Sequence, residues 1–252
     1  MIVFDQASPL SETGIVRHGF FGRDGGVSTG DFAGLNVSYS VGDDPEAVEE
    51  NRARIAQALG GGPLVTVRQV HSNRVVTIDG GALPDRSIEA DALVTRRTDI
   101  LIGVLTADCA PLLLADAHTG VVGAAHAGWR GAVDGILANT IAAREALGAR
   151  RSHIQFALGP TISAKNYEVG EEFKAAVLNQ NPSAERAFST PPGGKPHFDL
   201  PLYILEESRE LGLSATDLAL CTYAEPARFF SHRYATHQGT RTGRQIAVIG
   251  LA

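Results

Sequence analysis

The sequence contains little sulfur. Cysteine occurs only at Cys109 and Cys221 among 252 residues. Thiols in a cytoplasmic chain of this size usually stay unpaired, so we predict two free cysteines whose roles have to be explained separately. Cys221, at the end of a predicted strand, is expected to be a buried structural thiol.

Lysine is also scarce. It is confined to Lys165, Lys174 and Lys195, so arginine supplies most of the positive charge. Planar, bidentate anion binding therefore has more candidates than binding by a point charge. The net charge of -6 gives no general attraction to phosphate backbones or anionic lipids. Nucleic-acid and membrane binding are disfavoured as the main role, and an anionic ligand has to be bound locally.

No long hydrophobic run is present. The longest apolar stretches, 100–107 and 109–115, are separated by Asp108 and are too short to span a bilayer. Residues 1–14 lack a basic segment followed by an apolar one, so they do not resemble a signal peptide. We therefore expect a soluble, cytoplasmic protein.

Linkers, charge blocks and internal repeats are lacking as well. The composition, with 44% hydrophobic and 20% charged residues, is that of a globular protein with enough apolar material for a packed core. We predict one domain over residues 1–252.

Capping residues and apolar spacing predict helices at 45–59, at 130–147, from Asp199 to Gly212 and, more weakly, after Gly170. Strand-like runs occupy 15–21, 64–70, 74–78, 100–106, 111–115, 120–125, 154–158, 217–221 and 245–250. Several strands follow one another without an intervening helix, which argues against regular βαβ winding. The predicted fold class is α+β with mixed sheets.

Three predicted strands end in residues that can bind a metal. TADCAPLLLAD places Asp108 and Cys109 after one strand, VVGAAHAGWRG places His126 at the end of a second, and LVTVRQVHSNRV places His71 at the end of a third. One thiolate and two imidazoles suit Zn²⁺, and three protein ligands leave a fourth position open for water or substrate.

The residues alone leave three interpretations of this set. No CxxC or HxxxH pair is present, so the spacing is not that of a zinc finger. Cys109 can be a small buried residue beside ordinary polar histidines. Alternatively, Cys109 is a nucleophile with a histidine base and Asp108 as the orienting carboxylate. Sequence chemistry does not separate this metal-free site from a zinc site.

Arginines near these motifs are candidates for anion binding. Arg130 follows Gly128 at a predicted helix start, where it can bind phosphate together with backbone amides or serve as a surface residue. Arg233 in FFSHRY is a similar candidate, and both rank above Arg68. Gly128 and Gly131 indicate a close approach of the backbone.

Two amides are further candidates for substrate binding. Gln69 would share a strand face with His71, where it can contact a zinc-bound water or a substrate, or cap the strand. Asn36 in GLNVS is either a ligand contact or a turn residue.

The chain resembles the laccase-domain, or multicopper polyphenol oxidase-like, family, which includes the peptidoglycan editing factor. The resemblance extends from GGVSTGDFAGLNVS near residue 25 to the C-terminus, and the pairing of TADC with HAGWRG is its most specific feature. It rests on RQVHSNRV, ADALVT, TADCAPLLLAD, AAHAGWRGAVDGIL, GPTISAKNYEVG and FFSHR, in this order.

The resemblance implies that His71, Cys109 and His126 bind zinc, within a four-layer α/β/β/α sandwich. It also implies activity on purine nucleosides: phosphorolysis of adenosine, inosine or methylthioadenosine, and deamination of adenosine. Deamination needs a general acid or base, and Asp108 either serves as that group or holds its loop through backbone amides.

Three alternatives remain open. Some family members are implicated in cell-wall precursor editing, so one is a hydrolase that edits peptidoglycan precursors. The others are the metal-free Cys-His hydrolase and a noncatalytic module whose zinc supports the fold.

Two features limit what the family resemblance carries over. Copper is not expected, because the eight histidines include no His-x-His pair of the kind that multicopper oxidases use. The chain also has Thr161 in GPTI, where GPCI is frequent in the family, so no role of that family cysteine applies here.

Overall fold

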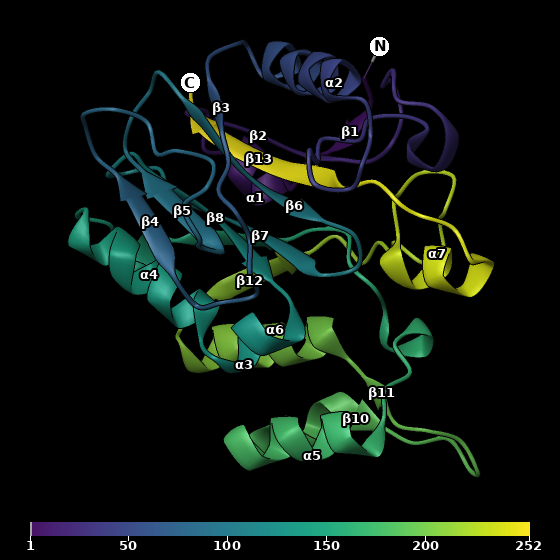
Figure 1. The fold of residues 1–252 in the computed structure, drawn as a ribbon. Coiled ribbons are helices and arrows are strands. Elements are labelled where there is room, and N and C mark those ends of the chain that lie inside the picture. The colour runs from purple at the N-terminus through teal and green to yellow at the C-terminus, as the bar shows by residue number, and fades with distance from the viewer. Residues whose placement is uncertain (1) are drawn as a thin grey trace.

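The computed structural model describes residues 2–252 and has four layers (Figure 1). At the top of the view, α2 (Pro45–Ala58) covers a five-stranded sheet. A six-stranded sheet lies beneath it, and its other face is covered by α4 (Ile136–Ala146) and α6 (Leu200–Glu210). The predicted α+β class and the α/β/β/α sandwich implied by the family resemblance are confirmed.

Both large sheets are mixed. In the first, the strand order is β1 (Phe4–Asp5), β2 (Val16–Phe21), β13 (Gln245–Leu251), β6 (Leu101–Thr106) and β3 (Leu64–Val65). In the second, it is β12 (Ser214–Asp217), β9 (Gln155–Leu158), β7 (Ala110–Asp116), β8 (Val121–Ala127), β5 (Ala92–Thr95) and β4 (Val75–Ile78). A separate ladder consists of β10 (Phe188–Ser189) and β11 (His197–Phe198).

The other α-helices are α1 (Ser8–Ser11), α3 (Trp129–Val133), α5 (Glu171–Gln180) and α7 (His232–Gln238). Short 3-10 segments lie at Gly30–Phe32, Arg151–His153, Ala164–Asn166 and Pro182–Ala187. At the bottom of Figure 1, α5 lies beside the β10–β11 ladder, and Phe173 of α5 packs against Phe188 of β10.

Side-chain alternation along the strands holds the layers together. In β13, Ala247 and Ile249 face the core between the two sheets, whereas Ile246 and Val248 pack in the core under α2. Strand β7 alternates in the same way between the central core and the core under α4 and α6. Because neighbouring side chains point to opposite faces, a strand that is apolar throughout has to be covered on both sides.

The helix predicted over 130–147 is two helices, α3 and α4. The break is at Gly135, whose φ of 85° is left-handed and cannot belong to an α-helix. The apolar spacing was the right signal for α4, because Ile136, Leu137 and Ile141 are buried against the sheet. The spacing does not reveal a one-residue change of backbone direction.

Two strand predictions differ from the structure: the strand predicted at 64–70 ends at Val65, and the one predicted at 217–221 lies at Ser214–Asp217. Four strands, β1, β5, β10 and β11, were not predicted. Each of these six strands is only two to four residues long and is defined by its pairing with another segment. Local alternation is too weak a signal at this length.

Helix α7 was not predicted either, although its ends carry recognisable signals. The Ser231 hydroxyl caps its start by accepting from the Tyr234 amide at 3.1 Å, and Gly239 ends it with a φ of 68°. This helix carries Arg233.

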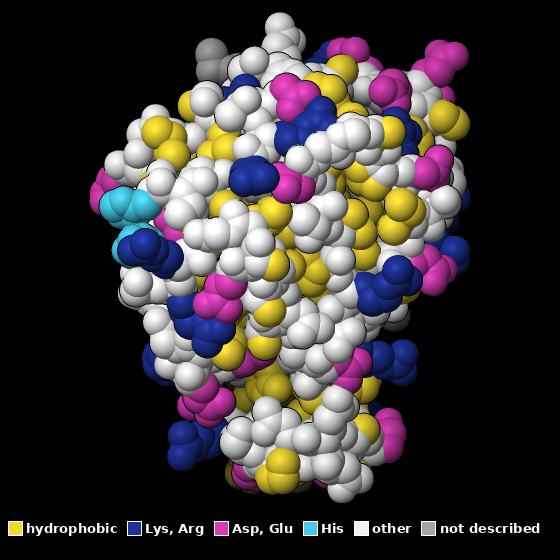
Figure 2. Space-filling view, turned by 90° about the vertical axis from the view of Figure 1, so that its left-hand side faces the viewer, with side chains coloured by type: hydrophobic (Ala, Val, Ile, Leu, Met, Phe, Trp, Pro, Cys, Tyr) yellow, Lys and Arg dark blue, Asp and Glu magenta, His cyan; other side chains and the backbone are white. Residues whose placement is uncertain are grey.

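Among residues 2–252, no helix combines the length and apolar character that crossing a bilayer requires. On the face seen in Figure 2, acidic and basic side chains are interspersed, with apolar side chains exposed between them.

The burial of His18, in β2, indicates that the free energy of unfolding decreases in acid. His18 is fully buried, and its Nε2 accepts a hydrogen bond from the Ala7 amide at 2.9 Å. Burial lowers the pKa of His18 to about 4, whereas an unfolded histidine titrates near 6.5. The stability due to the neutral ring is therefore present above about pH 6.5 and is lost as the pH falls toward 4.

We expect His18→Gln, which keeps an acceptor but does not titrate, to reduce the loss of unfolding free energy between about pH 7 and about pH 4.5 by about 2 kcal/mol. Urea denaturation at each pH measures this. An identical pH dependence in both proteins would exclude His18 as a source of acid sensitivity.

Candidate metal centre

Three potential metal ligands meet where the two sheets face each other. His71 lies between β3 and β4, Cys109 lies between β6 and β7, and His126 belongs to β8. Their donor atoms all lie within 4.8 Å of one another. Cys109 Sγ is 3.7 Å from His71 Nε2, and the two imidazole rings are 4.9 Å apart between centroids. We call these residues the His-Cys-His group.

The buried carboxylate of Asp91 connects two of the three residues. Its Oδ1 lies 2.8 Å from His126 Nδ1 and accepts from the His71 amide at 2.9 Å. Its Oδ2 accepts from the amides of Val70 and Ser72 and from the Ser72 hydroxyl. Burial opposes ionisation, but these hydrogen bonds and His126 lower the pKa of Asp91 to about 2. Asp91 thus leaves His126 Nε2 to face Cys109 and His71.

Backbone geometry brings the cysteine and the exposed histidine together. His71 and Asp108 have φ angles of 60° and 92°, values that side-chain-bearing residues rarely adopt. The close backbone approach predicted at Gly128 and Gly131 is confirmed. A Cβ atom at Gly128 would lie 2.5 Å from the His71 ring, and one at Gly131 would lie 2.9 Å from the Ser72 carbonyl oxygen.

Asp108 is held on every side by hydrogen bonds. Its carboxylate accepts from the Thr222 hydroxyl at 2.7 Å and from the Arg233 amide at 2.6 Å. Its carbonyl oxygen accepts from the Thr161 hydroxyl at 2.7 Å and from the Ile162 amide at 3.0 Å. The side chain therefore joins the turn before Cys109 to the first turn of α7.

Burial raises the pKa of the Cys109 thiol, but the neighbouring His126 and His71 outweigh it and bring the pKa down to about 6. For His126, burial lowers the pKa of the ring, but Cys109 and Asp91 outweigh burial and raise that pKa to about 9. These opposite shifts place a thiolate beside an imidazolium. A metal ion that binds both atoms takes the place of the imidazolium proton.

The second cysteine has no such partners. As predicted, Cys109 and Cys221 are both free. Cys221 is half-buried and is surrounded by donors from Ser163 and Asn166, with Ser163 Oγ 3.2 Å from its sulfur.

Two cavities flank the His-Cys-His group. The larger one, about 760 Å³, includes Gln69, Leu105 and Arg244 in its walls. The smaller one, about 310 Å³, includes Trp129 and Tyr167. Residues shared by both cavities are His71, Ala107, Cys109 and His232. The group is therefore accessible from two sides.

The two candidate amides lie in different surroundings. Gln69 lines the larger cavity, but its amide donates to the Leu105 carbonyl and accepts from the Leu105 amide, each at 2.7 Å. Asn36 is fully buried, and it is not among the residues of 2–252 that line either cavity. Its side chain binds Asp43 at 2.7 Å and accepts from the Arg244 amide at 2.9 Å.

The two candidate arginines both line the smaller cavity. Arg130 is exposed, with its guanidinium 5.1 Å from the Trp129 ring. Arg233 lies over the Tyr167 ring and donates to the Glu168 carbonyl at 2.8 Å.

Sequence reasoning missed two residues of this region. Asp91 lies in the ADALVT motif, but its partners are 19 to 35 residues away along the chain. Arg244 is half-buried in the larger cavity, where burial lowers its pKa and the charges of Cys109 and Asp108 oppose that shift. Its arginine-rich neighbourhood, YATHQGTRTGR, was the available signal.

Comparisons with known proteins identify relatives of the whole chain. A protein of Corynebacterium glutamicum named purine nucleoside phosphorylase is 39% identical over 239 residues, which cover 94% of both chains. A Deinococcus radiodurans protein of the same name is 42% identical over 245 residues, covering 94% of this chain and 89% of the relative.

Solved structures show the same fold. Neisseria meningitidis protein NMB0706 is 36% identical, with a TM-score of 0.82 and 94% of both chains covered. YlmD from Geobacillus stearothermophilus is 28% identical, with a TM-score of 0.85, and covers 100% of this chain and 99% of its own. The family model described as multi-copper polyphenol oxidoreductase laccase matches residues 17–252. The chain therefore belongs to the multi-copper polyphenol oxidoreductase laccase family.

Proposed function

We propose that this chain is a zinc-dependent purine nucleoside phosphorylase whose metal is held by His71, Cys109 and His126. The observation that carries the proposal is the convergence of these donors between two cavities, in a chain about 40% identical to proteins named purine nucleoside phosphorylase. We further propose adenosine, inosine and methylthioadenosine as substrates for phosphorolysis, and adenosine for deamination.

The donor geometry fits zinc. Tetrahedral bonds of about 2.3 Å to sulfur and about 2.0 Å to nitrogen separate the two donor atoms by about 3.5 Å. Cys109 Sγ and His71 Nε2 are 3.7 Å apart. His126 donates its Nδ1 proton to Asp91, which is the usual arrangement for a metal-ligating imidazole. Bound zinc supplies a Lewis acid at the junction of the two cavities.

The surrounding residues would bind and orient the reactants. In phosphorolysis, a phosphate oxygen forms a bond to C1′ of the ribose while the bond from C1′ to the purine nitrogen breaks, and the leaving base takes up a proton. We propose the larger cavity for the nucleoside, because about 760 Å³ is ample for a ligand of that size. Gln69 and Arg244 form part of its wall.

We propose that Arg130 and Arg233 position phosphate in the smaller cavity. Asp108 has both carboxylate oxygens engaged, by Thr222 and by the Arg233 amide. This favours a positioning role, in which Asp108 fixes Cys109 relative to Arg233, over a role as general acid or base. Asn36 would help to position Arg244 in the wall of the larger cavity, because its side chain accepts a hydrogen bond from the Arg244 amide.

Product analysis tests the proposal. We expect zinc-loaded protein incubated with adenosine and phosphate to form adenine and ribose 1-phosphate, and Cys109→Ser to reduce the rate at least about 100-fold by removing a metal ligand. Cys221→Ser, which changes the other free thiol, is the matched control and should keep the rate within about twofold. Chromatography of bases and nucleosides measures the adenine formed and the adenosine consumed.

Each other outcome has a distinct meaning. Inosine formed without phosphate would show deamination. Activity that survives chelation but not alkylation of Cys109 would favour a metal-free thiol enzyme. No base or inosine from zinc-loaded protein would contradict the nucleoside assignment altogether.

The contacts of Asp91 predict a role in metal retention. Asp91→Asn has nearly the same size, but one carboxylate oxygen becomes an NH₂ group that cannot accept from its donors. We expect this variant to bind zinc about 10-fold to 100-fold more weakly than wild type, as measured by competition with a colorimetric chelator.

Asp116→Asn is the matched control for Asp91→Asn. Asp116 is also a fully buried carboxylate that accepts from backbone amides, those of His118, Thr119 and Arg150, but it lies outside the His-Cys-His group. Both variants should lower the thermal midpoint, whereas only Asp91→Asn should lower zinc affinity. Equal zinc affinity in the two variants would mean that Asp91 only supports the fold.

A further inference from the structure

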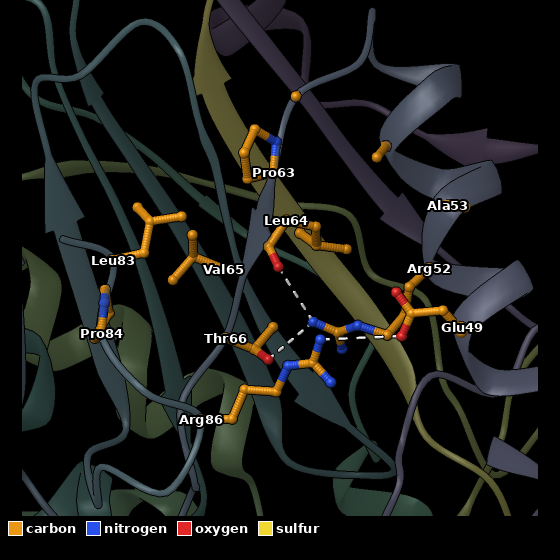
Figure 3. A pocket seen from close by; sticks show the side chains of 12 residues that line it. Glu49, Arg52, Ala53, Pro63, Leu64, Val65, Thr66, Leu83, Pro84 and Arg86 are labelled. Atoms are coloured by element: carbon orange, nitrogen blue, oxygen red, sulfur yellow. Dashed lines mark hydrogen bonds and ion pairs between the residues drawn. The ribbon is translucent and has the colours of Figure 1, made fainter. Parts of the chain in front are cut away.

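A third cavity lies beside the larger one. It encloses about 360 Å³ between α2 and the segment 81–88, and we call it the α2 cavity. In Figure 3, Leu83 and Pro84 form one wall and α2 forms the other. Three residues, Arg52, Thr66 and Arg86, line both the α2 cavity and the larger cavity. The two spaces therefore meet at these three side chains.

Arg52 is a buried positive charge without an ionic partner. It is only 4% exposed, and no carboxylate of residues 2–252 forms an ion pair with its guanidinium. Its hydrogen bonds go to the Val37 and Leu64 carbonyl oxygens, both at 3.3 Å, and to the Thr66 hydroxyl at 3.0 Å. Burying an unpaired charge is unfavourable unless something compensates it, so this position favours a ligand of opposite sign.

A second guanidinium lies next to it. Figure 3 shows the Arg52 and Arg86 guanidinium groups side by side, and both lie over the Tyr39 ring, at 5.5 and 4.7 Å from its centroid. Two cations held together at the junction of two cavities attract an anion. The Thr66 hydroxyl, which accepts from Arg52, still has its own hydrogen to donate.

Glu49 currently serves as the counter-ion of Arg86. Its carboxylate accepts from the Tyr39 hydroxyl and lies 3.9 Å from Arg86. The side chains of Arg86 and Glu49 are 58% and 65% exposed, and an ion pair this long and this exposed contributes little stability. A stronger anion can therefore displace Glu49 from Arg86 without unfolding any part of the chain.

We propose that Arg52 and Arg86, together with the Thr66 hydroxyl, form a subsite for a phosphate-type anion at the junction of the α2 cavity and the larger cavity. Donors that converge from three different segments suit a tetrahedral oxyanion, which offers acceptors in several directions. The anion is either free inorganic phosphate or a phosphate group carried by a nucleoside in the larger cavity. This subsite is distinct from the phosphate position proposed beside Arg130 and Arg233.

The test is calorimetric titration of zinc-loaded protein with inorganic phosphate, adenosine monophosphate and adenosine at constant ionic strength. Arg86→Gln removes one charge-assisted donor and should weaken binding of the phosphate-type ligand about 10-fold. Glu49→Gln removes the competing carboxylate and should strengthen the same binding several-fold. Arg52 stays unchanged in all variants, because its burial makes folding defects the expected result of substitution.

Arg54→Gln is the matched control. Arg54 lies on α2, as Arg52 does, but it lines neither the α2 cavity nor the larger cavity, and it is paired with Glu50 at 2.7 Å. Its substitution should leave phosphate binding within about twofold. Adenosine, which carries no phosphate, should bind all four proteins equally.

Arg86→Gln should weaken binding of the phosphate-type ligand and Glu49→Gln should strengthen it, and these opposite changes in affinity distinguish ligand binding from a structural role. If the pattern appears with inorganic phosphate, the subsite holds free phosphate; if only adenosine monophosphate shows it, the subsite holds the phosphate of a nucleotide. Weaker binding in both Arg86→Gln and Glu49→Gln, unchanged binding in both, or no binding of either phosphate ligand would overturn the proposal. Because this assay needs no turnover, its result is independent of the phosphorolysis assay.

Discussion

The candidate site depends on one buried carboxylate, that of Asp91. It accepts hydrogen bonds from three consecutive amides, at Val70, His71 and Ser72, and binds the His126 ring. Its backbone carbonyl also accepts from the His126 amide at 2.7 Å. Burying a carboxylate is unfavourable unless its oxygens accept hydrogen bonds, and here the donors come from the segments that carry His71 and His126, two members of the His-Cys-His group. The hydrogen bonds that compensate the buried Asp91 carboxylate are therefore the same ones that bring His71 and His126 together.

The position of the His-Cys-His group follows from the topology of the sandwich. The chain passes from the first sheet to the second between β3 and β4, and again between β6 and β7. The first crossing carries His71 and the second carries Cys109, each with a left-handed residue, at His71 and at Asp108. A crossing between packed sheets requires a sharp change of direction, and left-handed residues supply it at some cost in strain. The sheets themselves then hold the strained segments together.

Strand ends and ligand types could be predicted from the sequence, because they depend on local pattern. TADC and HAGWRG lie at the ends of long apolar strands, and those strands, β6, β7 and β8, formed close to their predicted places. The four layers came from the family resemblance and not from periodicity. Asp91, β5 and the early end of β3 were missed because each is determined by partners far away in sequence. Gly135 was missed because a single left-handed residue does not disturb apolar spacing.

Thr161, where the family resemblance led us to expect a cysteine, contacts the turn before Cys109. The Thr161 hydroxyl donates to the Asp108 carbonyl at 2.7 Å, next to the Ile162 amide, which donates to the same oxygen. A thiol at this position would be a weaker donor to that carbonyl. Among residues 2–252, the group that could hold a metal ion consists of His71, Cys109 and His126, and it does not include position 161. Thr161 instead strengthens the support of Asp108, whose left-handed backbone directs Cys109 toward the two histidines.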